Sequence, residues 1–137
     1  MPNKRRVFID SCVLISAATG RDDMALRAIE ALDDPEAEFV SSVFVQIETL
    51  PQSVYNKRPL EVEFYEEFFK KVSIWVDPNN ELAQKALEEA SRFGLGAIDS
   101  FHVAAAKSAG ATELITNEKP QRSIHRAKGI SIRSIAP

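Results

Sequence analysis

The sequence predicts an α/β fold in which helices cover both faces of a parallel sheet of about five strands. Short runs of β-branched and aromatic residues alternate along the chain with longer segments whose apolar residues recur at helical spacing. Such alternation builds βαβ units, and their right-handed connections give a three-layer α/β/α sandwich. Ligands of open parallel sheets bind beyond the carboxyl ends of the strands. We therefore look for chemically active residues directly after the strands.

Five segments have the composition of strands. They are residues 5–9 (RRVFI), 38–42 (EFVSS), 73–76 (SIWV), 113–116 (ELIT) and the alternating segment 129–135 (GISIRSI). Trp75 lies in the third of these strands, and we expect it to pack in the core rather than to form a base-stacking surface.

Helix signals lie between the strands. The expected helices are residues 11–20, 43–50 and 97–110, one that begins at Asp22 or Asp23, one that begins at Pro59, and one from Asn79 or Asn80 to Gly94. Ser41 or Ser42 caps the helix at 43–50, and Pro51 is expected to interrupt or kink it. Helical spacing gives one buried face to each of three helices: Leu26, Ile29 and Leu32; Leu60, Phe64 and Phe68; Leu82, Ala86 and Ala90.

Length and composition indicate an ordinary globular protein. The chain has 137 residues, of which 45% are hydrophobic and 27% charged, and we expect one domain over residues 1–137. Cys12 is the single cysteine, so no disulfide can form within the chain, and the reducing cytoplasm is the expected compartment. The first apolar run ends at Ile9, which is too short for a signal peptide or a membrane span.

Charge is distributed unevenly along the chain. The net charge is −3, but residues 119–137 carry +5 and no acid, whereas residues 1–118 carry −8. Such asymmetry is compatible with a phosphate-binding surface beside an acidic site, and a solvated basic surface or a loose tail is the ordinary interpretation. The candidate nucleic-acid-binding residues of the basic segment are Lys119, Arg122, Arg126 and Lys128. Near the other terminus, Lys4, Arg5 and Arg6 are further candidates.

Acidic residues follow strands or interrupt apolar helix faces at several places. Asp10 comes directly after the first strand, Glu48 has apolar neighbours in a helix, and Asp99 lies near the start of an apolar helix. Glu118 follows the fourth strand. Buried carboxylates repel one another by roughly 4 kcal/mol at 4 Å and an effective dielectric of 20, and a divalent cation such as Mg²⁺ or Mn²⁺ reverses that sign. Taken singly, each acid has an ordinary explanation: Asp10 as a helix cap, Glu48 as a solvated side chain, Asp99 as a charge favoured by the helix dipole, and Glu118 as a loop residue.

Three segments together resemble the PIN-domain nucleases. "VFIDSCVLI" (7–15) is similar to the opening strand and turn of that family, "SSVFVQIETL" (41–50) to its middle block, and "GLGAIDSFHVAAAKSAGATELITNEK" (94–119) to its later block. The order and spacing cover nearly the whole chain, and the later block is the most specific of the three.

The resemblance implies a three-layer α/β/α fold and hydrolysis of RNA phosphodiester bonds with Mg²⁺ or Mn²⁺. It assigns Asp10, Glu48 and Asp99 to the metal-binding acids, with Glu118 as the fourth acid and Asn117 as its alternative. Ser11 and Thr116 are then candidates to orient a ligand or a water. The resemblance also suggests a homodimeric toxin of a toxin–antitoxin pair, with an antitoxin protein as a partner.

The chain departs from the family pattern at the fourth acid. Glu118 stands where the family usually has Asp, so an inactive interaction domain with the same fold is the main alternative. Other parallel-sheet classes fit less well. A receiver domain needs an acid pair and a late Lys, a haloacid-type phosphatase needs Asp-x-Asp where Cys12 stands, and a dinucleotide site needs GxGxxG.

His102 lies one helical turn after Asp99, on the same face. A general base or zinc ligand is conceivable there, but the favoured interpretation is a packed helix residue. His125 is expected at the surface. Cys12 follows a strand as phosphatase nucleophiles do, but Ala18 stands where their phosphate-binding Arg is required.

Overall fold

The parallel sheet and its flanking helices confirm the expected α/β fold. The computed structural model describes residues 5–137, so Lys4 lies outside the described residues. All strand pairs are parallel, in the order β3-β2-β1-β4-β5. The strands are β1 (Arg5–Ile9), β2 (Ala37–Ser42), β3 (Val72–Val76), β4 (Glu113–Thr116) and β5 (Ser131–Ser134).

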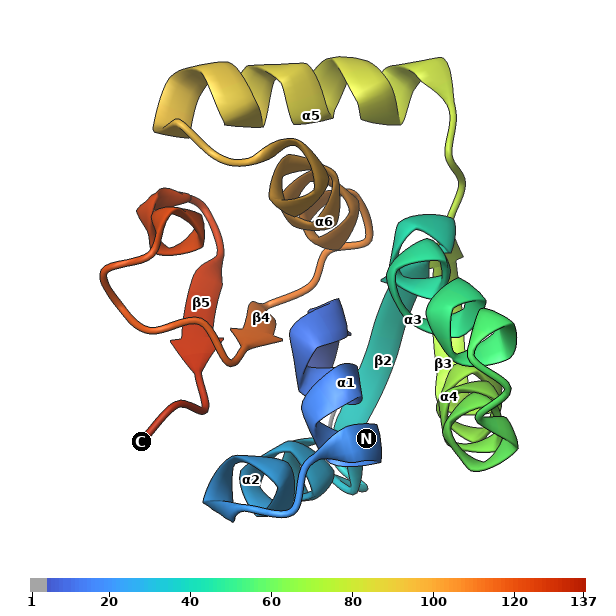
Figure 1. Cartoon of the computed structure of the whole chain (residues 1–137). Coiled ribbons are helices and arrows are strands. Elements are labelled where there is room, and N and C mark those ends of the chain that lie inside the picture. Colours follow the sequence, from blue (N-terminus) through green and yellow to red (C-terminus); the bar gives the residue numbers. More distant parts are fainter. Residues whose placement is uncertain (1–4) are drawn as a thin grey trace.

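Six helices flank the sheet in the described residues. They are α1 (Ser11–Thr19), α2 (Asp23–Leu32), α3 (Val43–Tyr55), α4 (Pro59–Lys71), α5 (Asn80–Phe93) and α6 (Ala97–Ser108), with a short 3₁₀ turn η1 (Ser123–Arg126) before β5. The chain moves from β1 to β2 to β3 in one direction and then returns to β4, so right-handed crossovers place α5 and α6 opposite the earlier helices. Figure 1 shows α5 and α6 together at the top of the view and α2 at the opposite side.

The centre of the sheet forms the core between the two helical layers. Val7, Phe8 and Ile9 of β1 are fully buried, as are Leu114 and Ile115 of β4. Consecutive residues of both strands are apolar because both faces of a central parallel strand are covered by helices. Within residues 5–137, none of the helices is both long enough and apolar enough to cross a membrane.

The expected buried face of α2 is wrong at two of its three positions. Leu26 and Ile29 are 61% and 43% exposed, and the buried face consists of Ala25, Ala28 and Leu32. Small alanine side chains allow α2 to approach α1 closely, so the larger residues turn outward. The expectation for α4 fails at Leu60 in the same way, because this first-turn residue is 79% exposed.

Trp75 differs from expectation, and Pro51 does not interrupt its helix. Trp75 is 41% exposed because β3 is an edge strand whose outer face is only partly covered, and its ring lies 5.6 Å from that of Phe69. Pro51 does not end its helix, since α3 continues to Tyr55. After Pro51, the hydroxyl of Ser53 links α3 to α4 by donating to Glu61 at 2.8 Å.

Asn79 caps α5, and its loss is expected to destabilise the protein. Its side chain accepts a hydrogen bond from the backbone N–H of Leu82 at 2.9 Å. The Asn79→Ala variant should lower the free energy of unfolding by about 1 kcal/mol, measured by urea denaturation. Asn80→Ala is the matched control, because Asn80 is exposed within the first turn. Equal losses in the two variants would contradict the capping role.

Candidate active site

The carboxyl ends of β1 and β4 meet at the point where the strand order reverses. The chain leaves β1 towards β2, whereas β4 lies on the other side of β1, and ligands bind at such switch points. The backbone N–H of Asp10 donates to the carbonyl of Ile115 at 2.9 Å. The side chain of Asp10 is almost completely buried, and the hydroxyl of Thr116 donates to its Oδ2 at 2.8 Å.

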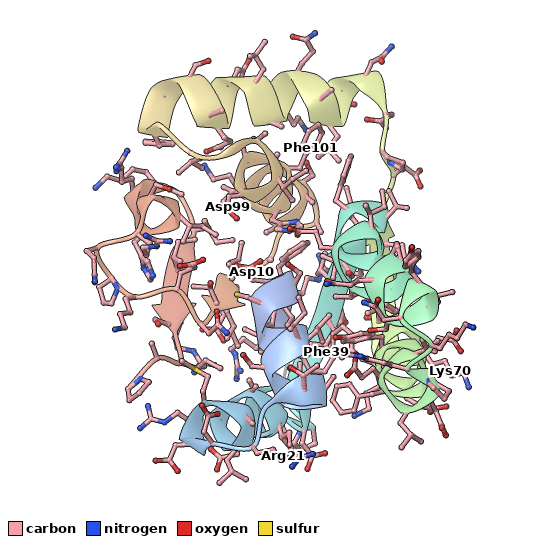
Figure 2. The ribbon with its side chains drawn as sticks, viewed as in Figure 1. Asp10, Arg21, Phe39, Lys70, Asp99 and Phe101 are labelled. Carbon is pink, nitrogen blue, oxygen red and sulfur yellow. The ribbon has the colours of Figure 1, made fainter. Side chains whose placement is uncertain are left out.

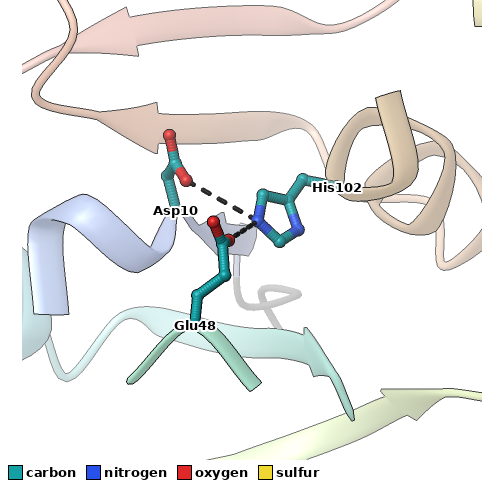
Figure 3. A group of neighbouring side chains, drawn as sticks. All are labelled: Asp10, Glu48 and His102. Atoms are coloured by element: carbon teal, nitrogen blue, oxygen red, sulfur yellow. Dashed lines mark hydrogen bonds and ion pairs between the residues drawn. The ribbon is translucent and has the colours of Figure 1, made fainter. Parts of the chain in front are cut away.

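Glu48 reaches the same place from α3 and meets His102 of α6. The His102 Nε2 lies 2.6 Å from Oε1 of Glu48 and 3.8 Å from Oδ1 of Asp10 (Figure 3). The ring of Phe44, one turn before Glu48 in α3, stacks on the ring of Phe101 in α6, with 4.3 Å between the ring centroids. This stacking packs the two helices against each other.

The two acids share a feature that suits a cation: one oxygen of each accepts a side-chain hydrogen bond, and among the described residues the other accepts none. Oε1 of Glu48 accepts from the Ser11 hydroxyl at 2.8 Å and contacts His102, and Oδ2 of Asp10 accepts from Thr116. Among the described residues, no side chain donates a hydrogen bond to Oε2 of Glu48. Asp10, Glu48 and His102 each bring one potential ligand atom within 4.8 Å of the others.

Asp99 faces this group from the first turn of α6. It is half-buried, and Figure 2 shows it close to Asp10. Burial raises the pKa of Asp99 to about 6, and the negative charges of Asp10, Glu118 and Glu48 add to the rise, whereas His102 opposes it. The carboxylate of Asp99 therefore lies within the field of the other three acids. A site that disfavours one more negative charge is suited to a cation.

The raised pKa predicts that Asp99 destabilises the metal-free fold at neutral pH. Its pKa of about 6 in the folded protein exceeds the ordinary value of 3.8 for an aspartate, so its stabilising contribution is complete below about pH 4 and is lost as pH rises through 6. Asp99→Asn should raise the free energy of unfolding at about pH 7.5 by about 1–2 kcal/mol, a figure reduced for partial exposure. Urea denaturation in a chelator, at about pH 5 and 7.5, measures this. A gain equal at both pH values would contradict it.

Glu48 has the opposite electrostatic environment. Burial would raise the pKa of Glu48, but the contacts to His102 and Ser11 together outweigh burial and leave its pKa lowered. Its side chain is 34% exposed, so it lies at the mouth of the site rather than beneath it. The interpretation of Glu48 as a merely solvated residue is therefore wrong.

The structure gives the two candidates for the fourth position different surroundings. The Asn117 amide donates to the carbonyl of Cys12 at 3.1 Å and to the Ser16 hydroxyl at 2.7 Å, which ties it to α1. Glu118 is more open, and its Oε2 accepts from Arg122 at 3.2 Å. The negative charge of Glu118 also raises the pKa of Asp99, so Glu118 interacts electrostatically with the other acids.

The segment between β4 and β5 carries several basic residues, and its first part follows the acids at the end of β4. Lys119 and Lys128 are exposed and make no ion pair among the described residues, whereas Arg122 pairs with Glu118. Arg126 lies near the carbonyls of Phe93 and Gly94, at 3.5 and 3.4 Å, which joins this segment to the loop before α6.

Arg5 and Arg6 lie at the opposite edge of the sheet, at the start of β1. Arg5 pairs with Asp34 and Glu113, and Arg6 pairs with Glu38. Because β1 runs the full depth of the sheet between them and Asp10, these arginines do not border the acids.

The structure also bears on the alternative roles considered for Asp10, Cys12 and the two histidines. Asp10 stands at the N-cap of α1, but its side chain makes no capping hydrogen bond. Burial raises the pKa of the Cys12 thiol, which argues against a nucleophile. His102 is fully buried, as expected of a packed residue, but its contact with Glu48 was not predicted. The sequence feature that could have pointed to a role of His102 in the site is its position one helical turn after Asp99. His125 is half-buried, with Nε2 2.9 Å from the carbonyl of Glu118.

Comparison with known proteins gives a family match and a set of similar folds. The family model described as the PIN domain matches residues 7–126. Curated protein sequences give no match.

The solved structures with similar folds are distant in sequence. VapBC2 from Rickettsia felis, bound to a DNA fragment from its promoter, has a TM-score of 0.71 and 14% identity over 94% of this chain and 98% of that one. DNA-bound VapBC from Salmonella typhimurium has a TM-score of 0.69 and 19% identity over 95% and 98%. VapC20 from Mycobacterium tuberculosis, a toxin that cleaves the sarcin–ricin loop, has a TM-score of 0.63 and 16% identity over 79% and 86%.

Proposed function

Because the chain belongs to the PIN domain family, we propose that it is a metal-dependent ribonuclease that hydrolyses RNA phosphodiester bonds. The observation that carries this proposal is the pair of carboxylates, Asp10 and Glu48, each with one oxygen that accepts a side-chain hydrogen bond and a second that accepts none within residues 5–137. Asp99 adds a third acid to the same field. Such a set of oxygen donors fits Mg²⁺ or Mn²⁺, which accept a few carboxylates and retain water ligands.

Each residue has a distinct task in this proposal. Asp10, Glu48 and Asp99 hold the divalent ion, and Glu118 is the fourth acid, directly or through water. When bound, the ion supplies an acidified water and positive charge next to the phosphate. Thr116 and Ser11 keep Asp10 and Glu48 in their orientations.

The proposal also assigns binding of the RNA backbone to the basic segment that follows Glu118. Lys119 and Arg122 come after the acids at the end of β4, and together with Lys128, which precedes β5, they are suited to hold the RNA backbone by charge. Arg126 belongs to the same segment, although its guanidinium also contacts the loop before α6.

The similar structures support a biological role as a toxin. Several of them are described as VapBC or toxin–antitoxin complexes. We infer that this chain acts as the ribonuclease toxin of such a pair, as a homodimer that a separate antitoxin protein inhibits. Expression of the chain alone should arrest growth, and co-expression of the protein encoded by a neighbouring gene should relieve the arrest.

Cleavage of RNA in the presence of Mn²⁺ tests the enzymatic proposal directly. Purified protein should cut single-stranded or structured RNA with Mn²⁺ or Mg²⁺ and should stop when a chelator removes the ion. Calorimetric titration with Mn²⁺ gives a second measurement. Absence of both metal binding and cleavage would instead support an inactive interaction domain, which the unusual Glu118 favours.

A further inference from the structure

We propose that His102 is a positioning residue, which donates a hydrogen bond from Nε2 to Oε1 of Glu48 and so directs the other oxygen of Glu48 to the divalent ion. The inference rests on the proposed function for the ion itself. The hydrogen bond and its orienting effect are properties of this chain and are measurable without RNA. No side chain other than His102 and Ser11 donates to Glu48 in residues 5–137.

Burial and distance identify the contact as a built feature of the site. His102 is fully buried, and its Nε2 lies 2.6 Å from Glu48. That distance is slightly shorter than the roughly 2.7–2.9 Å typical of a charge-assisted hydrogen bond between a nitrogen donor and a carboxylate. The Phe8 ring packs against the imidazole with 5.4 Å between centroids, which restricts rotation of the imidazole.

The other ring nitrogen determines which tautomer suits the site. The Nδ1 atom of His102 is buried without a hydrogen-bond partner among the described residues. A neutral imidazole with its proton on Nδ1 instead of Nε2 would leave a buried donor unpaired and would deprive Glu48 of its donor, and both changes are unfavourable. The tautomer with hydrogen on Nε2 satisfies the carboxylate and leaves only an acceptor unpaired.

The same hydrogen bond argues against His102 as a direct metal ligand. A ring nitrogen that carries a proton has no lone pair to offer an ion. Oε1 of Glu48 already accepts from His102 and Ser11, so its free oxygen is Oε2. The geometry points to Glu48 as the ligand and to His102 as the residue that orients it.

Glu48 needs such an anchor because its side chain is long and one-third exposed. Without His102, the carboxylate would keep one hydrogen bond, from Ser11, and would gain access to solvent-facing rotamers. Partners that orient a metal ligand typically change metal affinity by roughly 10- to 100-fold when they are removed. We expect an effect of that size on the affinity for Mn²⁺.

Two substitutions of His102 separate the positioning role from a structural one. In His102→Gln, the side-chain amide reaches about as far as Nε2 and keeps a donor for Glu48. In His102→Leu, the apolar packing is kept and the donor is lost. Calorimetric titration with Mn²⁺ should show binding roughly 10- to 100-fold weaker for the Leu variant and within a few-fold of wild type for the Gln variant. Thermal unfolding in a chelator establishes that both variants fold.

Nitrogen-15 NMR of the histidine rings tests the hydrogen bond independently of metal. The chain has two histidines, and His125→Gln leaves the signals of His102 alone. In the metal-free protein, His102 should show a proton on Nε2 and none on Nδ1, and Glu48→Ala should alter the Nε2 signal.

The outcomes distinguish this inference from the proposed function. A Gln variant that binds Mn²⁺ as weakly as the Leu variant would overturn the positioning role in favour of direct ligation, and an Nε2 without a proton would overturn the hydrogen bond to Glu48. A wild-type protein that binds no Mn²⁺ would refute the proposed metal site. In that case, the NMR result still supports or overturns the hydrogen bond to Glu48.

Discussion

RNA cleavage by the Asp10→Asn variant is expected to fall by on the order of a hundredfold or more in kcat/KM. Asparagine keeps the shape of the side chain and can still accept from Thr116, which donates to Oδ2 of Asp10 at 2.8 Å. The substitution removes a full negative charge from a nearly completely buried position. It therefore removes attraction for a divalent ion while leaving the packing intact.

The fold of the Asp10→Asn variant should be at least as stable as that of wild type in a chelator. Asp10 is the first of the charges that raise the pKa of Asp99, so its neutralisation relieves repulsion. Loss of activity with gain of stability is the signature of a charged site rather than of a damaged fold.

Asp77→Asn provides the matched control for this prediction. Asp77 is exposed and follows β3, much as Asp10 follows β1, but it lies outside the acid group. Its substitution should leave cleavage close to wild type in a single-turnover assay. Full activity of Asp10→Asn would remove Asp10 from the metal site, and unfolding of that variant would show a structural role instead.

Sequence patterns were sufficient to predict the strands and the residues that follow them. The apolar run before Asp10 and the run before Glu118 are buried on both faces, which a sequence without alternation already indicates. Since parallel strands end at one edge, Asp10 and Thr116 had to be neighbours once β1 and β4 paired. Their hydrogen bond follows from the register that places Ile9 opposite Ile115.

The meeting of Glu48 and His102 was not predictable from local patterns. They lie on helices from different layers, 54 residues apart in sequence. The contact depends on how α3 crosses the end of α6, which the stacking of Phe44 on Phe101 determines. Helical spacing assigns each residue to a face of its own helix, but does not show which other helix meets that face.

The spacing of apolar residues was also insufficient to predict which of them are exposed at the edges of the fold. Leu26 and Trp75 are apolar residues in regular positions, but they are 61% and 41% exposed. The face of a helix that becomes buried depends on what covers it, and an edge strand has a neighbour on one side only. Apolar residues are common on protein surfaces, so their spacing is weaker evidence of burial than an uninterrupted apolar run.

The triple variant Lys119→Ala/Arg122→Ala/Lys128→Ala is expected to bind single-stranded RNA on the order of a hundredfold more weakly at about 0.1 M salt. Each phosphate contact contributes about −0.7 to the slope of log affinity against log salt, so three lost contacts should reduce the slope by about 2. Arg126 is left in place because its guanidinium contacts the carbonyls of Phe93 and Gly94. Fluorescence anisotropy with chelator present measures binding without cleavage.

Lys70→Ala/Lys71→Ala/Lys85→Ala is the matched control, because it removes the same charge from α4 and α5, away from the acids. A general electrostatic effect would weaken binding equally in both triple variants, whereas a local phosphate-binding surface predicts a much larger loss for the segment beside Glu118. The fold should tolerate the first triple variant, since the Arg122–Glu118 ion pair is exposed and contributes little to stability. Equal salt slopes for wild type and the first triple variant would place the RNA backbone elsewhere on the protein.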